Sequence, residues 1–326
     1  GCREAALNFG RYSLLCVYVL SIICGEPTMD GIGNTPLFHI RGENEVLLKL
    51  EGLNLFGSIK DRAAAYLIEN GIKNGDIKST TEIVESSSGN FAVALAGMCK
   101  IYQLNFTCVI DPFIAEVNKK ILELYGAHIV MVTSTDIPGS YAQERIKTVK
   151  SIISKNSNSY WPNQYDSLVI CEAYKNTIGK EIANLYDIDY VFVAISTCGT
   201  IAGISQAIKE HSPDTKIIAV DIEGSKIFRN DSTVKKINGM GASFRPANLG
   251  RAYIDDVMII TTEECTNGCW ELLNYGILAG GSSGAVFAAC NKFIKEHELR
   301  EKRIVGILPD RGERYISSVY NSCLTK

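Results

Sequence analysis

Short runs of β-branched and aromatic residues alternate with longer amphipathic segments from residue 46 onward. Apolar strands separated by helical segments are typical of a parallel sheet that is covered by helices on both faces. The predicted strands are residues 46–50, 81–85, 106–110, 128–132, 190–195, 216–221, 257–260 and 303–308. The predicted helices include residues 61–74, 90–102, 116–125 and 139–155. The pattern therefore predicts an α/β fold of open, twisted sheets.

The length of the chain favours two lobes. A chain of 326 residues exceeds what a single hydrophobic core usually fills. The polar stretch at residues 155–159 (KNSNS) has the composition of a loop, and we expect the chain to cross between the lobes there. The sequence shows no internal repeat and no low-complexity tract.

Composition and charge favour small-molecule chemistry. The formal net charge is -3, which gives no basic surface for nucleic acid, and the hydrophobic fraction of 46% is ordinary for a globular protein. The 11 cysteines are scattered along an α/β-patterned chain, so we expect reduced thiols and a cytoplasmic location. Cys265 and Cys269 share a helix face, but no nearby cysteine or histidine pair completes a metal site, and we expect none.

Residues 1–28 have an uncertain status. They contain the apolar run YSLLCVYVLSIIC at residues 12–24, which resembles the core of a signal peptide but lacks a small-x-small cleavage site. The run is too short for a comfortable membrane span. We expect either a buried or subunit-contacting helix, or an upstream extension before a start at Met29.

Four glycine- or serine-rich turns lie where a predicted strand ends or a predicted helix begins, and ligands bind at such places in open α/β sheets. The first turn holds Lys60. The partial positive charge of a helix N-terminus disfavours the ammonium form and keeps an amine nucleophilic, as Schiff-base formation requires. On this segment alone, the alternative is an exposed lysine in a helix cap.

The other three turns offer hydroxyls and backbone N–H groups. Residues 86–90 (SSSGN) suit a carboxylate, whereas an ordinary helix cap would explain only one of the serines. Residues 196–200 (STCGT) suit a cofactor phosphate, because the lysine-containing loop of nucleotide triphosphate sites is absent. Residues 280–285 (GGSSGA) place a serine where its hydroxyl could bond a ring nitrogen, with a capped turn as the alternative.

In this order and spacing, the turns resemble the cysteine synthase family, the β-replacement branch of fold-type II pyridoxal-phosphate enzymes. The similarity runs from about residue 32 to residue 320, opens with IGNTPL at residues 32–37 and closes with ILPDRGERY at residues 307–315. It implies a homodimer and two open α/β lobes with pyridoxal 5'-phosphate between them. We expect a smaller lobe of residues 54–160 and a larger lobe of residues 29–53 plus 161–326.

The resemblance implies a role for each matching position. Lys60 would hold the cofactor as a Schiff base and later remove the substrate Cα proton. Asn90 would contact the 3'-oxygen and Ser282 the pyridine nitrogen; a serine there makes the ring a weaker electron sink than a carboxylate would, which favours β-elimination over transamination. The positions matching the phosphate site are Ser196, Thr197, Cys198, Gly199 and Thr200. The positions matching the loop over the substrate carboxylate are Ser87, Ser88, Gly89 and Phe91.

Several positions depart from ordinary cysteine synthases. Phe56 adds bulk beside the expected cofactor, and Ser196 and Cys198 replace glycines. With GAS at residues 241–243 and DRG at residues 310–312, these positions look closer to the siderophore-pathway branch that makes N-(2-amino-2-carboxyethyl)-L-glutamate. That branch joins O-phospho-L-serine to L-glutamate and supplies 2,3-diaminopropionate.

The substrates of that branch are anionic, which calls for cationic side chains. Arg145 and Tyr165 match positions of the branch, as does Ser196. Arg311 is a further candidate, because a guanidinium donates paired hydrogen bonds to carboxylate or phosphate. The alternative for either arginine is a surface ion pair.

We therefore expect a pyridoxal-phosphate-dependent transferase that acts on small amino acids, without a nucleic-acid or membrane partner. The first alternative is cysteine synthase, with sulfide as the nucleophile and O-acetylserine or O-phosphoserine as its partner. Cystathionine β-synthase is less expected, because the sequence offers no obvious haem-binding or regulatory segment. A non-catalytic partner protein that keeps the cofactor pocket is the alternative of another class.

Overall fold

The structure, a computed structural model, describes residues 31–135, 141–229 and 239–321. Residues from Ile32 onward form one compact unit, to which the following description applies. The predicted N-terminal extension at residues 1–28 lies outside the described residues, as do the first two residues of the helix predicted at 139–155. None of the described helices is long and apolar enough to cross a membrane.

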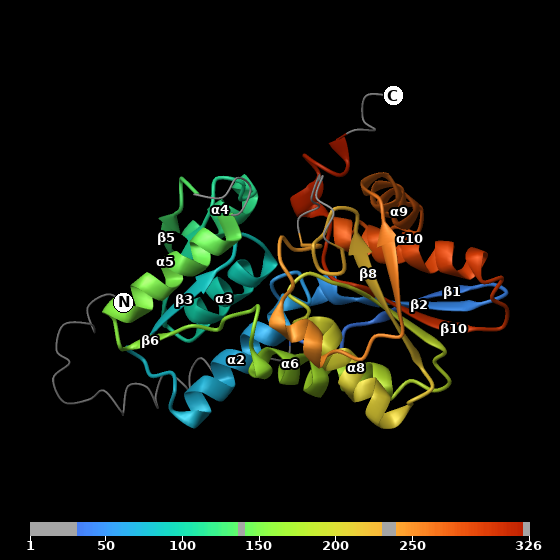
Figure 1. The fold of residues 1–326 in the computed structure, drawn as a ribbon, viewed down its shortest axis with the longest axis horizontal. Helices are drawn as coiled ribbons and strands as arrows, with labels where there is room; N and C mark the ends of the chain where they lie inside the picture. Colours follow the sequence, from blue (N-terminus) through green and yellow to red (C-terminus); the bar gives the residue numbers. More distant parts are fainter. Residues whose placement is uncertain (1–30, 136–140, 230–238, 322–326) are drawn as a thin grey trace, which may run out of the picture. The chain divides into compact units, whose positions relative to one another are not determined.

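Two sheets form the framework of the unit (Figure 1). The four-stranded sheet has the order β5-β4-β3-β6, and every pair in it is parallel. Its strands are β3 (Glu82–Ser86), β4 (Asn105–Ile110), β5 (His128–Met131) and β6 (Ser159–Tyr160). The six-stranded sheet has the order β1-β2-β10-β7-β8-β9, in which only the β1–β2 pair is antiparallel. Its strands are β1 (Leu37–Arg41), β2 (Glu45–Leu50), β7 (Tyr190–Ala194), β8 (Lys216–Ile222), β9 (Asp256–Ile260) and β10 (Arg303–Leu308).

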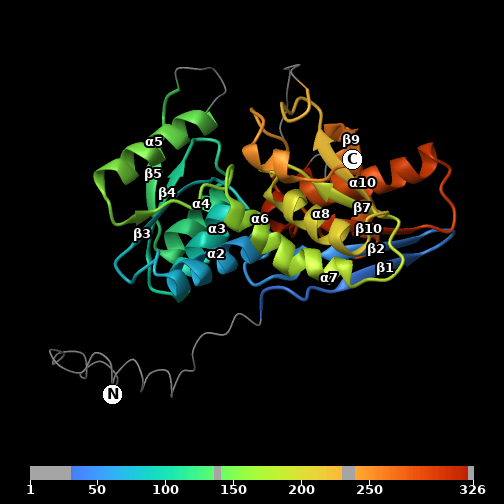
Figure 2. The same ribbon diagram turned by 60° about the horizontal axis from the view of Figure 1, so that its bottom comes forward.

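Helices cover both sheets. The helices that accompany the four-stranded sheet are α2 (Lys60–Asn74), α3 (Asn90–Ile101), α4 (Glu116–Tyr125) and α5 (Tyr141–Lys155). Those that accompany the six-stranded sheet are α6 (Leu168–Tyr174), α7 (Lys180–Ala183), α8 (Gly199–His211), α9 (Thr262–Asn274) and α10 (Gly281–Glu296). The short turns η1 (Glu51–Leu53), η2 (Lys175–Gly179), η3 (Ala247–Arg251) and η4 (Glu313–Tyr315) complete the chain. Helices α6, α7 and α8 lie on one face of the larger sheet (Figure 2), and α9 and α10 lie on the other face (Figure 1).

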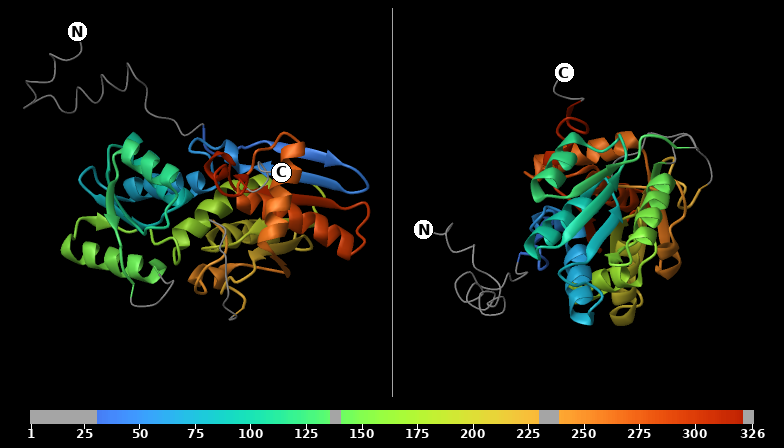
Figure 3. Two further views of the ribbon diagram at one scale, coloured as in Figure 1. Left: turned by 90° about the horizontal axis from the view of Figure 1, so that it is seen from above. Right: turned by 90° about the vertical axis from the view of Figure 1, so that its left-hand side faces the viewer.

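Each sheet has its own hydrophobic core. Buried residues of β7, β8 and β10, among them Phe192 and Ile218, pack against α10, which contributes Phe293. In the smaller sheet, Val84 and Val109 pack against Val149 of α5. The two sheets and their helices lie at opposite ends of the unit (Figure 3). The carboxyl ends of β3, β7 and β10 carry the turns that meet between them.

The predicted α/β fold and its eight strands are confirmed, with ends that shift by one residue or none. β1, β6 and the helices between β6 and β7 were not predicted from the sequence. The crossing predicted at residues 155–159 is wrong, because Ser159 and Tyr160 pair with β3 and the chain leaves the smaller sheet only afterwards. The lobe limits at residues 54 and 160 stay a prediction.

Candidate active site

A cavity of about 1250 Å³, counting its open mouth, lies between the two sheets. Lys60 borders it from α2, the turn at residues 87–91 from the end of β3, and the turn at residues 196–200 from the end of β7. Ser282 reaches it from the start of α10. The tertiary structure therefore brings all four predicted turns to one place.

Lys60 is the first residue of α2, and the helix start is held from within. The buried Asp61 carboxylate accepts hydrogen bonds from the Phe56 N–H at 2.6 Å and from the Ser58 hydroxyl at 3.2 Å. The Lys60 ammonium nitrogen lies 3.5 Å from the Thr200 hydroxyl. Burial lowers the pKa of Lys60 from 10.5 to about 8, because a desolvated ammonium is unfavourable. A useful fraction of this amine is therefore neutral and nucleophilic near neutral pH.

A buried ionic cluster around Arg62 anchors the same helix two residues after Lys60. The Arg62 guanidinium bonds the Glu51 carboxylate at 2.6 and 2.8 Å and the Glu181 carboxylate at 2.5 and 3.0 Å. Lys49 adds a contact to Glu181 at 2.6 Å. The arginine and its neighbours hold the pKa of Glu181 down at about 2, despite the opposing effect of burial. The cluster ties α2 to β2, η1 and α7, and so fixes the base of Lys60.

The turn at residues 196–200 is shaped to receive an anion. Cys198 has a φ of 62°, in the left-handed region, and α8 begins directly after it. Backbone N–H groups in such a turn, together with a helix N-terminus, attract negative charge. Helix α8 approaches α6 closely at Gly203, where a Cβ would lie 2.3 Å from the Cys171 carbonyl oxygen. The position of this turn is thus set by backbone-to-backbone packing.

The turn at residues 87–91 is fastened from the side opposite Lys60. Asn118 donates to the Ser88 carbonyl at 3.2 Å, and Gln164 donates to the Ser86 carbonyl at 2.9 Å. The Arg145 guanidinium donates to the Ser88 hydroxyl at 3.1 Å and forms a close ion pair with Asp111. Gly89 has open space where a Cβ would stand, so the backbone there is accessible from the cavity.

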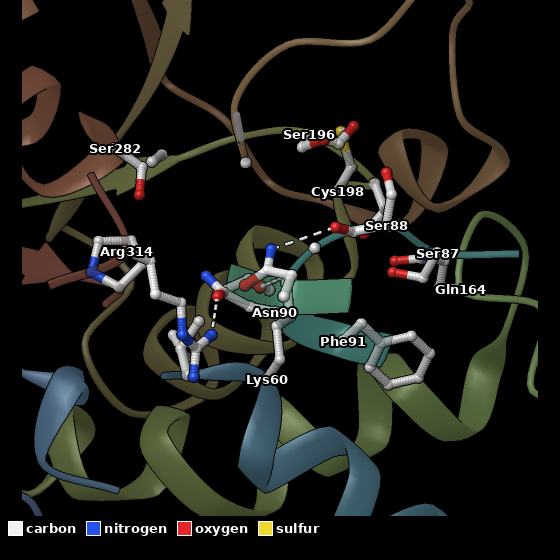
Figure 4. A pocket seen from close by; sticks show the side chains of 18 of the residues that line it. Lys60, Ser87, Ser88, Asn90, Phe91, Gln164, Ser196, Cys198, Ser282 and Arg314 are labelled. Carbon is white, nitrogen blue, oxygen red and sulfur yellow. Dashed lines mark hydrogen bonds between the residues drawn. The ribbon is translucent and has the colours of Figure 1, made fainter. Parts of the chain in front are cut away.

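Asn90 and Ser282 contact polar side chains of the segment after β10, namely Asp310, Arg314 and Tyr315. The Asn90 amide oxygen accepts from Arg314 at 2.5 Å (Figure 4), and its nitrogen donates to Asp310 at 2.7 Å. The Ser282 hydroxyl lies 3.4 Å from the Asp310 carboxylate. Tyr315 donates to Asp310 at 2.5 Å.

The sequence prediction and the structure agree on most of the lining. The predicted residues that border the cavity are Lys60, Ser87, Ser88, Gly89, Asn90, Phe91, Arg145, Tyr165, Ser196, Thr197, Cys198, Thr200 and Ser282. Gly199 is the first residue of α8, directly behind that lining. Their roles toward a cofactor or substrate stay predictions.

Two expectations are wrong in placement. Arg311 lies outside this cavity: its side chain is exposed and pairs with Glu313, because the turn after β10 directs residues 310 and 314 inward and 311 outward. Phe56 does not stand beside the expected cofactor. Its ring packs over Gly97 of α3 and edge-on to Tyr125, with ring centroids 6.0 Å apart.

The sequence analysis missed Arg314, Asn118 and Gln164, which also line the cavity. Arg314 belongs to the ILPDRGERY segment at residues 307–315, and its place in that segment was the only signal that the sequence offered for it. Asn118 and Gln164 lie in segments without a motif. Only the packing of α4 and of the segment after β6 brings them to residues 86–88.

The residues present fit pyridoxal 5'-phosphate. A desolvated lysine, an anion-binding turn 3.5 Å from that lysine at Thr200, and a buried serine at another helix start match its aldehyde, phosphate and ring. Among the residues that the structure describes, no group of histidine, cysteine or acidic side chains could hold a metal ion.

Known proteins give the same assignment. The sequence pattern of the family described as "Pyridoxal-phosphate dependent enzyme" matches residues 28–310. The O-acetylserine-dependent cystathionine β-synthase of Helicobacter pylori is 30% identical with a TM-score of 0.82, covering 89% of this chain and 96% of that one. An O-ureido-L-serine synthase is 25% identical with a TM-score of 0.83, covering 90% and 95%. The cysteine synthase of Entamoeba histolytica is 28% identical with a TM-score of 0.80, covering 90% of both chains.

Proposed function

Because this chain belongs to the family of pyridoxal-phosphate-dependent enzymes, whose β-replacement members it matches in fold, we propose that it joins O-phospho-L-serine to L-glutamate. The product would be N-(2-amino-2-carboxyethyl)-L-glutamate, a source of 2,3-diaminopropionate for siderophore synthesis. The observation that carries this choice of substrates is the buried guanidinium of Arg145 in the cavity wall.

We assign the residues of the chain as follows. Lys60 binds the cofactor through its amine and takes the proton from the substrate Cα. The turn at residues 196–200 holds the phosphate, and the turn at residues 87–91 binds the substrate carboxylate. Ser282 faces the ring nitrogen and Asn90 the 3'-oxygen. When bound, the cofactor draws electrons from the substrate and so makes loss of the group at Cβ feasible.

Arg145 supports anionic substrates by its position and its free donor. The residue is only 7% exposed, and its Nε is buried without a hydrogen-bond partner among the described residues. A buried N–H that lacks a partner costs free energy, and the guanidinium that carries it belongs to a residue lining the cavity, where a carboxylate or phosphate would pair with its charge. Asp111 pairs with the Nη1 of this guanidinium, and the same nitrogen donates to the Ser88 hydroxyl, so the guanidinium is already oriented toward Ser88. Tyr165 adds a hydroxyl beside the same group.

A second candidate is cysteine synthesis from an O-activated serine and sulfide. The similarity to the cysteine synthase of Entamoeba histolytica favours it. Sulfide is small and needs no carboxylate-binding arginine, so under this alternative Arg145 would serve only to hold Ser88.

Incubation of the purified holoenzyme with each pair of substrates, followed by mass spectrometry, separates the two. We expect the coupled product from O-phosphoserine and glutamate. Turnover of O-acetylserine and sulfide alone would exclude the glutamate reaction. We further expect Arg145→Met to lower kcat/KM for glutamate about tenfold or more, since a charge-assisted hydrogen bond is lost. The matched variant Arg311→Met removes an exposed guanidinium outside the cavity and should change nothing.

We also propose a homodimer, as the resemblance implies, and a cytoplasmic location, as the scattered cysteines suggest. Sedimentation equilibrium of the holoenzyme tests the assembly.

A further inference from the structure

Asp310 has a buried carboxylate that meets side chains from three other elements. The residue is 4% exposed and follows β10 by one proline. Its Oδ2 accepts from both the Asn90 amide at 2.7 Å and the Tyr315 hydroxyl at 2.5 Å, and its Oδ1 lies 3.4 Å from the Ser282 hydroxyl. All of these donors are neutral groups. Burying a carboxylate among neutral donors costs free energy, so we expect this carboxylate to have a role beyond stabilising the fold.

The position of this carboxylate is fixed by packing. The Asp310 carbonyl accepts from the Gly280 N–H at 3.1 Å and from the Ser283 hydroxyl at 3.2 Å. A Cβ on Gly280 would lie 2.1 Å from an Asp310 carboxylate oxygen. Gly280 has a φ of -74°, so the glycine is needed for space and not for backbone conformation. The carboxylate therefore has little freedom to move away from Asn90.

The Asn90 side-chain amide is held by hydrogen bonds at both its oxygen and its nitrogen. Its oxygen accepts from the Arg314 guanidinium at 2.5 Å, while its nitrogen donates to Asp310. A flipped amide would place its oxygen against a carboxylate and its nitrogen against a guanidinium, and both contacts would be repulsive. An amide nitrogen carries two N–H groups, and Asp310 takes one of them. The other remains available on the amide that lines the cavity.

We propose that Asp310 is a positioning residue which, together with Arg314, orients the Asn90 amide so that an N–H group faces the 3'-oxygen of the bound cofactor. The inference rests on the role of Asn90 in the proposed function. An N–H group directed at that oxygen stabilises it as an anion. Arg314 also donates to the Phe56 carbonyl at 2.6 Å, which holds its guanidinium in place beside Asn90.

The acceptor role of Asp310 follows from the hydrogen bonds. Burial raises the pKa of Asp310, and the hydrogen bonds from Tyr315 and Asn90 and the charge of Arg314 limit that rise. The Asn90 amide and the Tyr315 hydroxyl both donate to Oδ2, which can accept from them whether or not the carboxyl group is ionised.

The test is the absorption spectrum of the holoprotein without substrates, recorded for Asp310→Asn, Arg314→Met, their double variant and Asn90→Ala. Each change should shift the cofactor's 3'-oxygen toward its protonated form, which is responsible for the shorter-wavelength absorption band. The absorbance of that band relative to the visible band should therefore rise about tenfold. The double variant should shift no further than the single variants, because both act through one amide. Arg311→Met, directly after Asp310 in the sequence but outside the cavity, should leave the spectrum unchanged.

Two outcomes would overturn the inference in different ways. A shift in Asn90→Ala alone, with Asp310→Asn and Arg314→Met folded and unshifted, would overturn the positioning role and leave the proposed function intact. No shift in Asn90→Ala would refute the assigned role of Asn90 as well. Near-UV circular dichroism checks folding. If Asp310→Asn does not fold, Arg314→Met still decides, since it frees the other end of the same amide. Because no substrate is present, the choice of nucleophile does not affect the result.

Discussion

Lys60 should destabilise the cofactor-free protein, and its replacement by methionine should therefore stabilise it. The pKa of Lys60 is about 8 in the folded protein, against 10.5 for an ordinary lysine. Between these two values the unfolded chain binds more protons than the folded one, so the stability of the wild-type protein rises with pH through this window. Methionine has a similar length and never carries the charge.

The size of the effect follows from the two pKa values. Linkage gives a full cost of about 3 kcal/mol near pH 7 and about 1 kcal/mol near pH 10. Lys60 is only half-buried, so we discount these figures by about half and expect a gain for Lys60→Met of about 1.5 kcal/mol near pH 7 that falls to about 0.5 kcal/mol near pH 10.

Urea unfolding of the cofactor-stripped wild type and variant at a series of pH values measures this gain, because the difference between the two cancels all other titrating groups. The matched control is Lys73→Met in the last turn of the same helix, where the side chain is exposed and no gain is expected. A Lys60→Met gain that does not change between pH 7 and pH 10, or a loss of stability at pH 7, would refute the assignment of a desolvated amine.

Three further predictions concern stability and are measured by urea unfolding of the holoprotein. Arg62→Met leaves Glu51 buried without its partner and should cost about 3–5 kcal/mol, so a loss below about 1 kcal/mol would contradict the buried cluster. Gly97→Ala places a Cβ 2.3 Å from the Phe56 ring and should cost about 1–3 kcal/mol; Phe56→Leu in the same chain should restore much of this, and simple additivity would exclude the contact. Thr261→Ala removes the capping box of α9 and should cost about 0.5–2 kcal/mol, whereas Thr261→Ser should cost little.

Phe56 shows how a correct observation from the sequence can lead to a wrong inference. The sequence places this large residue four positions before Lys60, which suggests bulk beside the cofactor. The ring is instead accommodated by Gly97, about 40 residues later, because a helix without a side chain at that position leaves a slot of the right depth. A local motif carries no information about that distant partner.

Arg311 and Arg314 illustrate the same limit within one motif. Both lie in the segment that carried the family resemblance, and the sequence analysis chose the first of them. The direction of each side chain depends on the backbone path after β10, where Gly312 packs against the Leu278 and Ala279 segment and η4 follows. This path turns residue 314 toward Asn90 and leaves residue 311 exposed.

The sequence by itself determined the α/β fold, eight of the ten strands within the described residues, and which polar groups the four turns carry. Strand and helix periodicities and helix-start residues are local properties, so a single chain displays them directly. Only the tertiary structure decided which side chains meet. These contacts are the ion pairs of Arg62, the packing of Phe56 over Gly97, and the hydrogen bonds of Asp310 and Arg314 to the Asn90 amide. Those contacts join residues from about 10 to more than 200 positions apart, and their geometry is set by how the two sheets and their helices pack, which no local pattern encodes.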